Sequence, residues 1–439
     1  MYLDSTPRSR ELFERARKYL PGGVSYALRH FSPYPFYVVK AKGSRIWDVD
    51  GNEYLDLWMG HGAIVTGHGY EPVIRAAMEQ LEYGAHFGWC HEWEVKWAEA
   101  VCRWFDMDMA RPSNSGTEAN MYAIRLARAY TGRVKVGKFE GGWHGGYDGL
   151  HKGVSYPYDR PASAGLPESV TKDIVLLPYN DLDGVRERVK GEDLACIIVE
   201  PVMGAAGFIP AEREFLRGLR ELCDERGIVL IFDEVITGFR FYKGAQNYYN
   251  VKPDIITTGK AVGGQYFPAG ALCGRAEIME RLDQIKIPNF WERSFHGGTY
   301  VGNPLTMRAG YTLIRELEDK TDKFFPYLER LGRKALEGLN EILSRNDFEA
   351  YTTGLGSLFA IHFTKERPIN GLTAERTKDR ELTKKLFEFM LDNRVVYLSP
   401  SVAHFVLSIA HTEDDVNRFL ALVEEFIRLR IRKNDALRC

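Results

Sequence analysis

Two charged residues follow short apolar segments in the middle of the chain. Asp233 ends the run Ile228–Phe232, and Lys260 follows the strand-like segment 254–258 by two residues. A carboxylate at the carboxyl end of a central strand lies where open α/β sheets bind ligands, and its burial is costly unless a cation or hydrogen bonds meet it. A lysine just past a buried strand is poorly solvated, which favours the neutral amine and therefore imine chemistry. Taken alone, Asp233 could cap a turn and Lys260 could be a surface lysine.

The segment Asn114–Ala119 has the pattern of a loop that enters a helix. Ser115 with Glu118 three residues later matches a capping box, and an apolar stripe at helical spacing follows. The small residues allow backbone N–H groups to approach a ligand, and such a helix start favours phosphate. An ordinary capped helix is the alternative interpretation.

An aromatic residue among glycines follows another predicted strand. In the segment Glu140–Gly146, Trp143 could stack on a flat ring, although alone it could also belong to the core, and His144 could be a loop histidine. The order of the four signals is more specific than any one of them. A phosphate anchor, a ring cover, an anionic partner for a pyridinium and an imine-forming lysine are what pyridoxal 5′-phosphate (PLP) requires.

The elements that must position these residues alternate along the chain. Short apolar runs at 134–139, 195–199, 228–232 and 254–258 have helical stretches such as 118–130 and 212–226 between them. This alternation predicts an α/β fold with a mainly parallel sheet. A helix and a β-hairpin are expected before it and longer helices after it.

Three regions are predicted from these changes of pattern. Residues 1–69 form an N-terminal segment that packs with a small domain, residues 70–310 form the large α/β domain, and residues 311–439 form a small α+β domain. A chain of 439 residues is expected to contain more than one core.

Composition excludes several classes of function. The net charge of -2 argues against a nucleic-acid-binding protein, and no apolar run approaches the roughly 20 residues of a membrane helix. The six cysteines lack CxxC spacing, so neither a metal site nor a disulfide framework is expected, and the thiols fit a cytoplasmic protein.

The chain resembles the class III PLP-dependent aminotransferases of fold type I from about residue 10 to 425. Within this family it is most similar to the glutamate-1-semialdehyde 2,1-aminomutases. The strings that carry the resemblance include SNSGTEAN (113–120), FEGGWHG (139–145), EPVMGAAGFIP (200–210), LIFDEVITGFR (230–240), PDIITTGKAVGG (253–264) and GTYVGNPL (298–305).

The resemblance implies a role for each matching position. It implies that Ser115, Gly116 and Thr117 bind the phosphate and that Trp143 and Val235 cover the two faces of the ring. It also implies that Asp233 pairs with the ring nitrogen and that Lys260 is the point of covalent attachment. His144 and Glu200 are assigned to the same cofactor site. Thr299 is expected to reach the phosphate of a neighbouring subunit, so the protein is expected to be a homodimer with its site at the interface.

The substrate side departs from the aminomutase pattern. Arg29 matches an arginine that faces the substrate carboxylate, and Asn180 matches a position that lines the site. Tyr26 stands where the aminomutases have serine, and His61 lies in a string that differs from theirs. The glutamate-bearing C-terminal loop of the aminomutases is also missing from residues 401–405.

We therefore expect an aminotransferase that acts on a small carboxylate-bearing α- or β-amino acid with a keto acid or aldehyde acceptor. The alternative is a glutamate-1-semialdehyde 2,1-aminomutase, which transfers the amine within one substrate skeleton and gives 5-aminolevulinate. A PLP-dependent racemase would use the same lysine and is the third interpretation.

Overall fold

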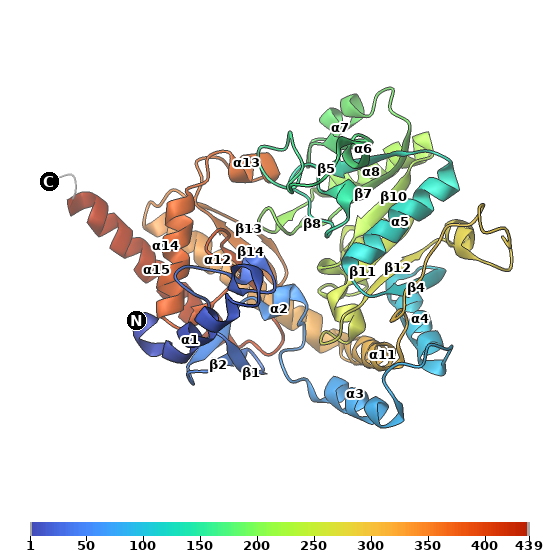
Figure 1. The fold of residues 1–439 in the computed structure, drawn as a ribbon. Helices are drawn as coiled ribbons and strands as arrows, with labels where there is room; N and C mark the ends of the chain where they lie inside the picture. The colour runs from blue at the N-terminus through green and yellow to red at the C-terminus, as the bar shows by residue number, and fades with distance from the viewer. Residues whose placement is uncertain (1, 437–439) are drawn as a thin grey trace. The chain divides into compact units, whose positions relative to one another are not determined.

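The computed structural model describes residues 2–436, and the chain divides into two compact units (Figure 1). Within the described residues, the first unit comprises 2–70, 326–368 and 377–436, and the second comprises 71–325 and 369–376. The predicted boundary at residue 310 lies 15 residues earlier than the boundary at 325 (325 − 310). Helix α11 (Pro304–Asp319) stays with the second unit because it packs against α3 (Glu71–Tyr83) and α4 (Glu92–Phe105). Residues 437–439 of the predicted C-terminal domain lie outside the described residues.

The second unit is built on a seven-stranded sheet. Its strands, in spatial order, are β4 (Met109–Ser113), β12 (Gly270–Gly274), β11 (Ile255–Gly259), β10 (Val229–Asp233), β7 (Leu194–Val199), β5 (Lys135–Phe139) and β6 (Ile174–Leu177). The pairs from β11 to β6 are parallel, whereas β12 is antiparallel to both β11 and β4. The predicted mainly parallel sheet is confirmed, and the reversed strand β12 is an addition to that prediction.

Helix α5 (Gly116–Thr131) covers one face of this sheet (Figure 1). Its buried positions, among them Ala123, Ile124 and Leu126, form a core with Ile198 of β7 and Ile231 of β10. Further helices of this unit are α6 (Glu168–Thr171), α7 (Leu182–Arg188), α8 (Arg213–Arg226), α9 (Gly244–Tyr249), α10 (Ala276–Met279) and α13 (Gly371–Glu375). Strands β8 (Val202–Met203) and β9 (Ile209–Pro210) form a separate pair.

The first unit contains two smaller sheets. The predicted hairpin is formed by β2 (Arg45–Asp48) and β3 (Glu53–Asp56), which pair antiparallel between β1 (Val38–Lys42) and β15 (Val395–Val396). The second sheet has β13 (Tyr351–Leu355), β14 (Leu358–His362) and β16 (His404–Val406). Helices of this unit are α1 (Pro7–Ala16), α2 (Met59–Gly62), α14 (Arg380–Asp392) and α15 (Glu413–Ala436), together with most of α12 (Thr321–Arg345).

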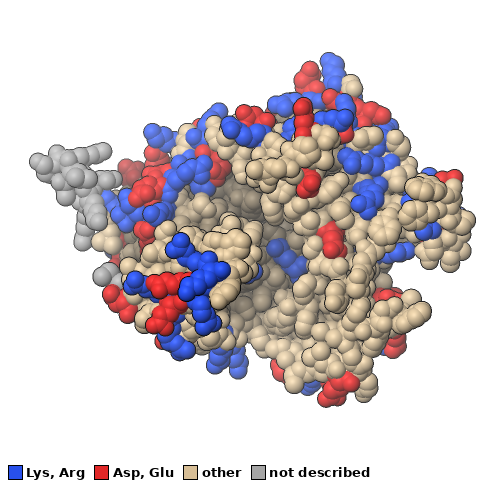
Figure 2. Space-filling view, viewed as in Figure 1, with Lys and Arg blue, Asp and Glu red and all other residues tan. Residues whose placement is uncertain are grey.

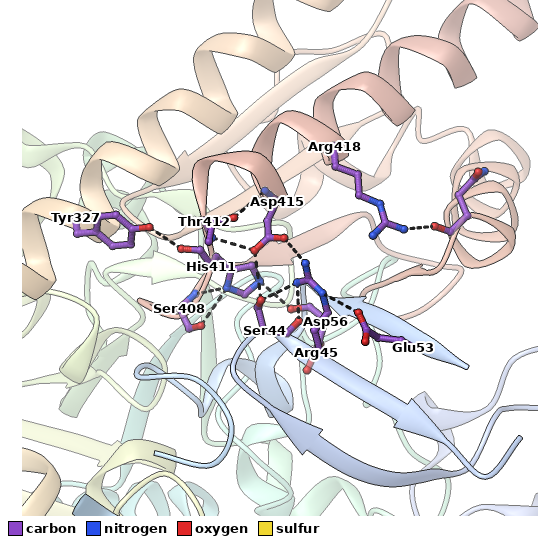
Figure 3. Close-up of polar contacts among 11 residues, drawn as sticks. Ser44, Arg45, Glu53, Asp56, Tyr327, Ser408, His411, Thr412, Asp415 and Arg418 are labelled. Atoms are coloured by element: carbon purple, nitrogen blue, oxygen red, sulfur yellow. Dashed lines mark hydrogen bonds and ion pairs between the residues drawn. The ribbon is translucent and has the colours of Figure 1, made fainter. Parts of the chain in front are cut away.

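A buried polar network joins the start of α15 to the hairpin of the first unit (Figure 3). His411 Nδ1 lies 3.0 Å from Ser408 Oγ, and its Nε2 lies 3.0 Å from the carbonyl oxygen of Asp56. Asp415 accepts hydrogen bonds from Arg45 and from the backbone N–H of Thr412. Because carbonyl oxygens only accept, Nε2 must carry the proton of the neutral His411 ring. Burial lowers the pKa of His411 to about 4.

The surface carries charges of both signs. Lys and Arg are interspersed with Asp and Glu on the face shown in Figure 2, in keeping with 58 basic and 60 acidic residues in the sequence. Within residues 2–436, no helix has the combination of length and apolar character that a bilayer crossing demands.

The neutral His411 predicts a loss of stability on acidification. Its folded pKa of about 4 lies below the ordinary 6.5, so the unfolded chain binds the extra proton between these values. Stability is therefore lost as the pH falls from about 6.5 to about 4, by about 3 kcal/mol at most. We expect His411→Asn to flatten the dependence of the urea-unfolding midpoint on pH across this window, with His404 and His296 retaining part of the slope.

The exposed His30 provides the control, since His30→Asn should leave the slope unchanged. An unaltered slope in His411→Asn would show that protonation of this histidine does not contribute to acid unfolding.

Candidate functional site

The carboxyl ends of four neighbouring parallel strands bring the predicted cofactor residues of the second unit to one edge of the sheet. Strand β10 ends at Asp233, Glu200 follows β7, Lys260 follows β11, and the turn that carries Trp143 and His144 follows β5. The strands pair in register, with Phe232 beside both Val199 and Ile256. Residues that are far apart in sequence therefore meet where parallel sheets bind ligands.

Asp233 is buried and hydrogen-bonded on both carboxylate oxygens. Oδ2 accepts a hydrogen bond from Asn120 Nδ2 at 2.8 Å and lies 2.8 Å from His144 Nδ1, while Oδ1 accepts from the backbone N–H of Val235 at 3.0 Å. Each carboxylate oxygen can accept two hydrogen bonds, so Oδ1 retains capacity for a further donor. The arrangement holds an anion ready for a cationic or N–H partner.

His144 supports this carboxylate from a fully buried position. Burial lowers the pKa of His144, although the adjacent Asp233 raises it, so the neutral ring is favoured at neutral pH. With Asp233 ionised, Nδ1–H donates to Oδ2 and Nε2 is left as an acceptor. Among the described residues this buried Nε2 has no hydrogen-bond partner.

Lys260 combines enclosure with a distorted backbone. Its φ of 54° places it in the left-handed region, which non-glycine residues seldom adopt outside functional or strained positions. Burial lowers the pKa of its amine to about 8, while Asp233 raises it. The residue is surrounded by protein yet keeps part of its surface open, so a small molecule could reach it.

The start of α5 forms one half of the predicted capping box, because the Glu118 carboxylate accepts the N–H of Asn114 and not that of Ser115. Ser115 is the N-cap residue and its Oγ accepts the N–H of Glu118 at 3.1 Å, which leaves the first N–H groups of a 16-residue helix without intrahelical partners. Thr117 Oγ1 accepts the N–H of Gly146 at 3.1 Å. Gly116 lies against Val235, since a Cβ there would come within 2.8 Å of the valine side chain.

The other predicted cofactor residues, Trp143, Glu200 and Thr299, differ in burial. Trp143 is 38 % exposed and contacts His151 edge-on, with 5.7 Å between ring centroids. Glu200 is buried and accepts the N–H groups of Trp143 and Gly204. Thr299 lies in an exposed segment between β12 and α11.

The predicted substrate residues fall into two groups. Asn180 lies in the second unit, and its side-chain amide is hydrogen-bonded to backbone groups. Nδ2 donates to the carbonyl oxygens of Pro210 and Ile369, and Oδ1 accepts the N–H of Glu212. These contacts favour a structural role, so the geometry gives no support to substrate binding by this side chain.

The other three predicted substrate residues lie together in the first unit. The rings of Tyr26 and His61 are 5.6 Å apart, and His61 has a φ of 60°. Arg29 is exposed and donates to Ser25 Oγ at 2.8 Å. Burial raises the pKa of Tyr26, and the charge of Arg29 offsets part of this rise. An aromatic pair beside an exposed guanidinium could contact a carboxylate-bearing molecule.

Asn120 is a site residue that sequence reasoning missed. It is buried on α5, where its Nδ2 bonds Asp233 and its Oδ1 accepts Thr257 Oγ1 at 2.5 Å. The available signal was an amide next to Ala119, at the start of the apolar stripe of α5. Its partner could not be named without the fold.

These groups fit PLP in chemical type. The carboxylate of Asp233 could hold the proton on a ring nitrogen, the open N–H groups at the start of α5 could hold a phosphate, and Lys260 supplies an amine. Among residues 2–436 no group of three or more His, Cys, Asp or Glu side chains is arranged to hold a metal ion.

A mainly parallel sheet that gathers a buried aspartate, a lysine and a phosphate-type helix start at one edge defines a fold type I PLP-dependent enzyme. Comparison with known proteins agrees. The family model of the class III aminotransferases matches residues 26–415, and the chain belongs to this family. The enzymes of the family use PLP, so PLP is the cofactor of this one.

Individual relatives span almost the whole chain. The chain is 41% identical over 423 residues to the glutamate-1-semialdehyde 2,1-aminomutase of Methanosphaera stadtmanae, covering 95% of this chain and 97% of that protein. Among solved structures, an omega-transaminase from Sphaerobacter thermophilus has a TM-score of 0.89 at 33% identity and covers 97% of this chain and 98% of its own. A beta-phenylalanine aminotransferase from Variovorax paradoxus has a TM-score of 0.86 at 31% identity, covering 97% and 95%.

The close approach of Gly145 to the start of α5 gives a test of the anion site. Gly145 has a φ of 85°, and a Cβ there would lie 2.2 Å from Thr117 Oγ1 and 2.8 Å from its Cα. We expect Gly145→Ala to displace Thr117, to lower the free energy of unfolding by about 2 kcal/mol or more, and to weaken PLP binding.

Gly146→Ala is the matched control, because nothing lies within 4 Å of a Cβ at that position. Urea unfolding and equilibrium dialysis with PLP measure both effects. Equal PLP binding by the two variants would argue against phosphate recognition at this helix start.

Proposed function

We propose that the protein is a glutamate-1-semialdehyde 2,1-aminomutase, which moves the amine between neighbouring carbons of one substrate and gives 5-aminolevulinate. The observation that carries the proposal is the 41% identity to an aminomutase across nearly the full length of both chains. This reaction was the alternative expectation from sequence, and the comparisons favour it over the intermolecular reaction that the substrate-side departures suggested.

The proposed mechanism assigns each step to a residue of this chain. PLP, when bound, withdraws electrons from the substrate carbon that loses a proton. Lys260 attaches the cofactor at rest and, once released, moves the proton between carbon atoms, for which its lowered pKa is suited. Asp233 keeps the ring nitrogen protonated, with Asn120 and His144 fixing the orientation of its carboxylate.

The phosphate is proposed to bind at Ser115, Gly116 and Thr117. There the open N–H groups and the positive end of the α5 dipole supply donors and field without a charged side chain. Trp143 and Val235 are proposed to cover the two faces of the ring, and Val235 already contacts the phosphate segment at Gly116.

Arg29 is proposed to bind the substrate carboxylate. Its guanidinium is exposed and donates to Ser25 Oγ, and an incoming carboxylate could displace that contact and form a bidentate pair. A pair of this kind predicts that Arg29→Met raises KM for carboxylate substrates more than tenfold and leaves kcat nearly unchanged, as steady-state kinetics would measure. A matching rise for the exposed Arg10→Met would remove Arg29 from this role.

An intermolecular aminotransferase is the second candidate. Transaminase structures at 33% and 31% identity also span nearly the full chain. Tyr26, which stands where the aminomutases have a serine, forms an aromatic contact with His61, and this pair would suit a larger donor. The shared lysine chemistry also permits racemisation, which chiral analysis of recovered amino acids would reveal.

The half-reaction distinguishes these candidates. The purified PLP-loaded protein is mixed with single donors while the cofactor absorbance is followed: α-amino acids, β-amino acids, simple amines and 4,5-diaminovalerate. The aminomutase proposal predicts a response to the diamino acid and formation of 5-aminolevulinate from the semialdehyde. Conversion by ordinary amino acids, without isomerisation of the semialdehyde, would establish the aminotransferase instead.

The attachment point is tested by chemical reduction. Borohydride treatment of the PLP-loaded protein should add the cofactor mass to the peptide that contains Lys260, and Lys260→Ala should abolish both this label and turnover. The exposed Lys252 serves as a control, because Lys252→Ala breaks only an ion pair with Asp106. Retained labelling in Lys260→Ala would place the attachment elsewhere.

We also propose that the protein is a homodimer in which Thr299 reaches the phosphate site of the partner subunit. Support comes from the exposed apolar side chains of the segment between β12 and α11, the gold loop in Figure 1, which include Ile285, Phe290 and Trp291. A monomer rarely exposes so many large apolar groups in one segment. Sedimentation at the mass of one 50.1 kDa chain would contradict a dimer.

A further inference from the structure

Lys138 is a fully buried lysine that the assigned roles do not use. It lies on the inner strand β5 between Leu176 of β6 and Ile198 of β7, a place that strands of this kind fill with apolar residues. Burial of an amine is costly, and here it lowers the pKa of Lys138 to about 7. A buried donor with this cost is expected to have a specific acceptor.

That acceptor is the carbonyl oxygen of Gly142, to which Lys138 Nζ donates at 2.7 Å. Gly142 lies in the turn that follows β5. The turn is compact, because a Cβ at Gly142 would lie 3.1 Å from the carbonyl oxygen of Phe139 and 3.2 Å from His144 Nε2. The lysine therefore holds the backbone of a crowded turn from within the sheet.

Glu200 holds the same turn from the neighbouring strand. Its Oε1 accepts the N–H of Trp143 at 2.8 Å and its Oε2 accepts the N–H of Gly204 at 2.9 Å. Burial and the nearby Asp233 raise the pKa of Glu200 to about 8, against the opposing effects of these two N–H groups and of Lys138. The two oxygens of Glu200 accept separate N–H groups, so this side chain connects the turn after β5 to the segment after β7.

The carbonyl of Gly142 and the N–H of Trp143 belong to one peptide group. Lys138 holds its oxygen and Glu200 holds its hydrogen, so rotation of this peptide would break both hydrogen bonds at once. The two residues that follow the peptide are Trp143 and His144, whose Nδ1 contacts Asp233. The orientation of one peptide plane therefore sets the direction of both side chains.

We propose that Lys138 and Glu200 are positioning residues that clamp the Gly142–Trp143 peptide and thereby fix Trp143 against the cofactor ring and His144 against Asp233. The proposal rests on the proposed function in one respect, namely that Trp143 covers PLP. It assigns Glu200 to the turn that carries the ring cover, where the resemblance assigned it only to the cofactor site.

The test compares Lys138→Met with Lys135→Met in the PLP-loaded protein. Methionine fills the volume of Lys138 but cannot donate, and Lys135 lies on the same strand with a partly exposed side chain that pairs with Glu192. The clamp predicts that Lys138→Met binds one PLP per chain, loses at least half of the visible circular dichroism of the cofactor, and releases PLP about tenfold faster. Lys135→Met should match the unaltered protein in all three measurements.

Glu200→Gln provides an independent variant if Lys138→Met fails to fold. One amide oxygen can replace only one of the two acceptors of Glu200, so the same loss of circular dichroism is expected. Because both residues act on one peptide, the double variant should be no worse than the more affected single variant. Additive losses, or unchanged circular dichroism in a folded variant, would overturn the clamp. Failure of the unaltered protein to show a cofactor band would instead contradict the proposed function.

Discussion

The buried carboxylate of Asp233 is the group around which the second unit is organised. Its three hydrogen bonds come from three different segments: Asn120 on α5, His144 after β5 and the N–H of Val235 in its own turn. An ionised carboxylate in an apolar interior is tolerated only when donors of this kind surround it. Helix α5 must therefore pack on the sheet, and β5, β7 and β10 must pair in this register, for the donors to reach the carboxylate.

Further ionisable groups are buried near Asp233. Burial lowers the pKa of the two enclosed lysines, Lys138 and Lys260, whereas the nearby Glu200 raises the pKa of both and Asp233 also raises that of Lys260. Glu234 is fully buried as well, but its carboxylate is bound by the N–H groups of Ala245 and Gln246 at the start of α9. Burial raises its pKa to about 7, and its contacts are structural. The neighbouring residues Asp233 and Glu234 therefore differ in role: Asp233 belongs to the candidate site, and Glu234 binds the backbone at the start of α9.

Local sequence predicted the sheet and its strands because runs such as 228–232 are apolar without interruption, as strands covered on both faces must be. It also predicted the capped start of α5. Antiparallel β12 was not distinguished, because its small residues Gly270, Ala271 and Gly274 carry no strand signal and its direction depends on pairing with distant β4.

The sequence allowed the ionisable residues of the site to be predicted, but not the residues that hold them in position. Asp233 and Lys260 stand out since charge is unexpected after apolar runs. Lys138 looks in sequence like an alternating strand residue, and only the neighbouring strands reveal that it is enclosed. For Asn180, a matching position in the sequence did not reveal that backbone groups occupy its amide.

The reversed direction of β12 has a consequence for the order in which the protein is assembled. Strands β11 and β12 are consecutive and antiparallel, with Gly259 paired to Gly270, so the segment that carries Lys260 is closed by a local hairpin. Local pairings form without the long crossovers that parallel neighbours require. The segment that carries Lys260 is therefore shaped by a pairing between consecutive strands, whereas two of the donors to Asp233, Asn120 and His144, lie 113 and 89 residues away in the sequence.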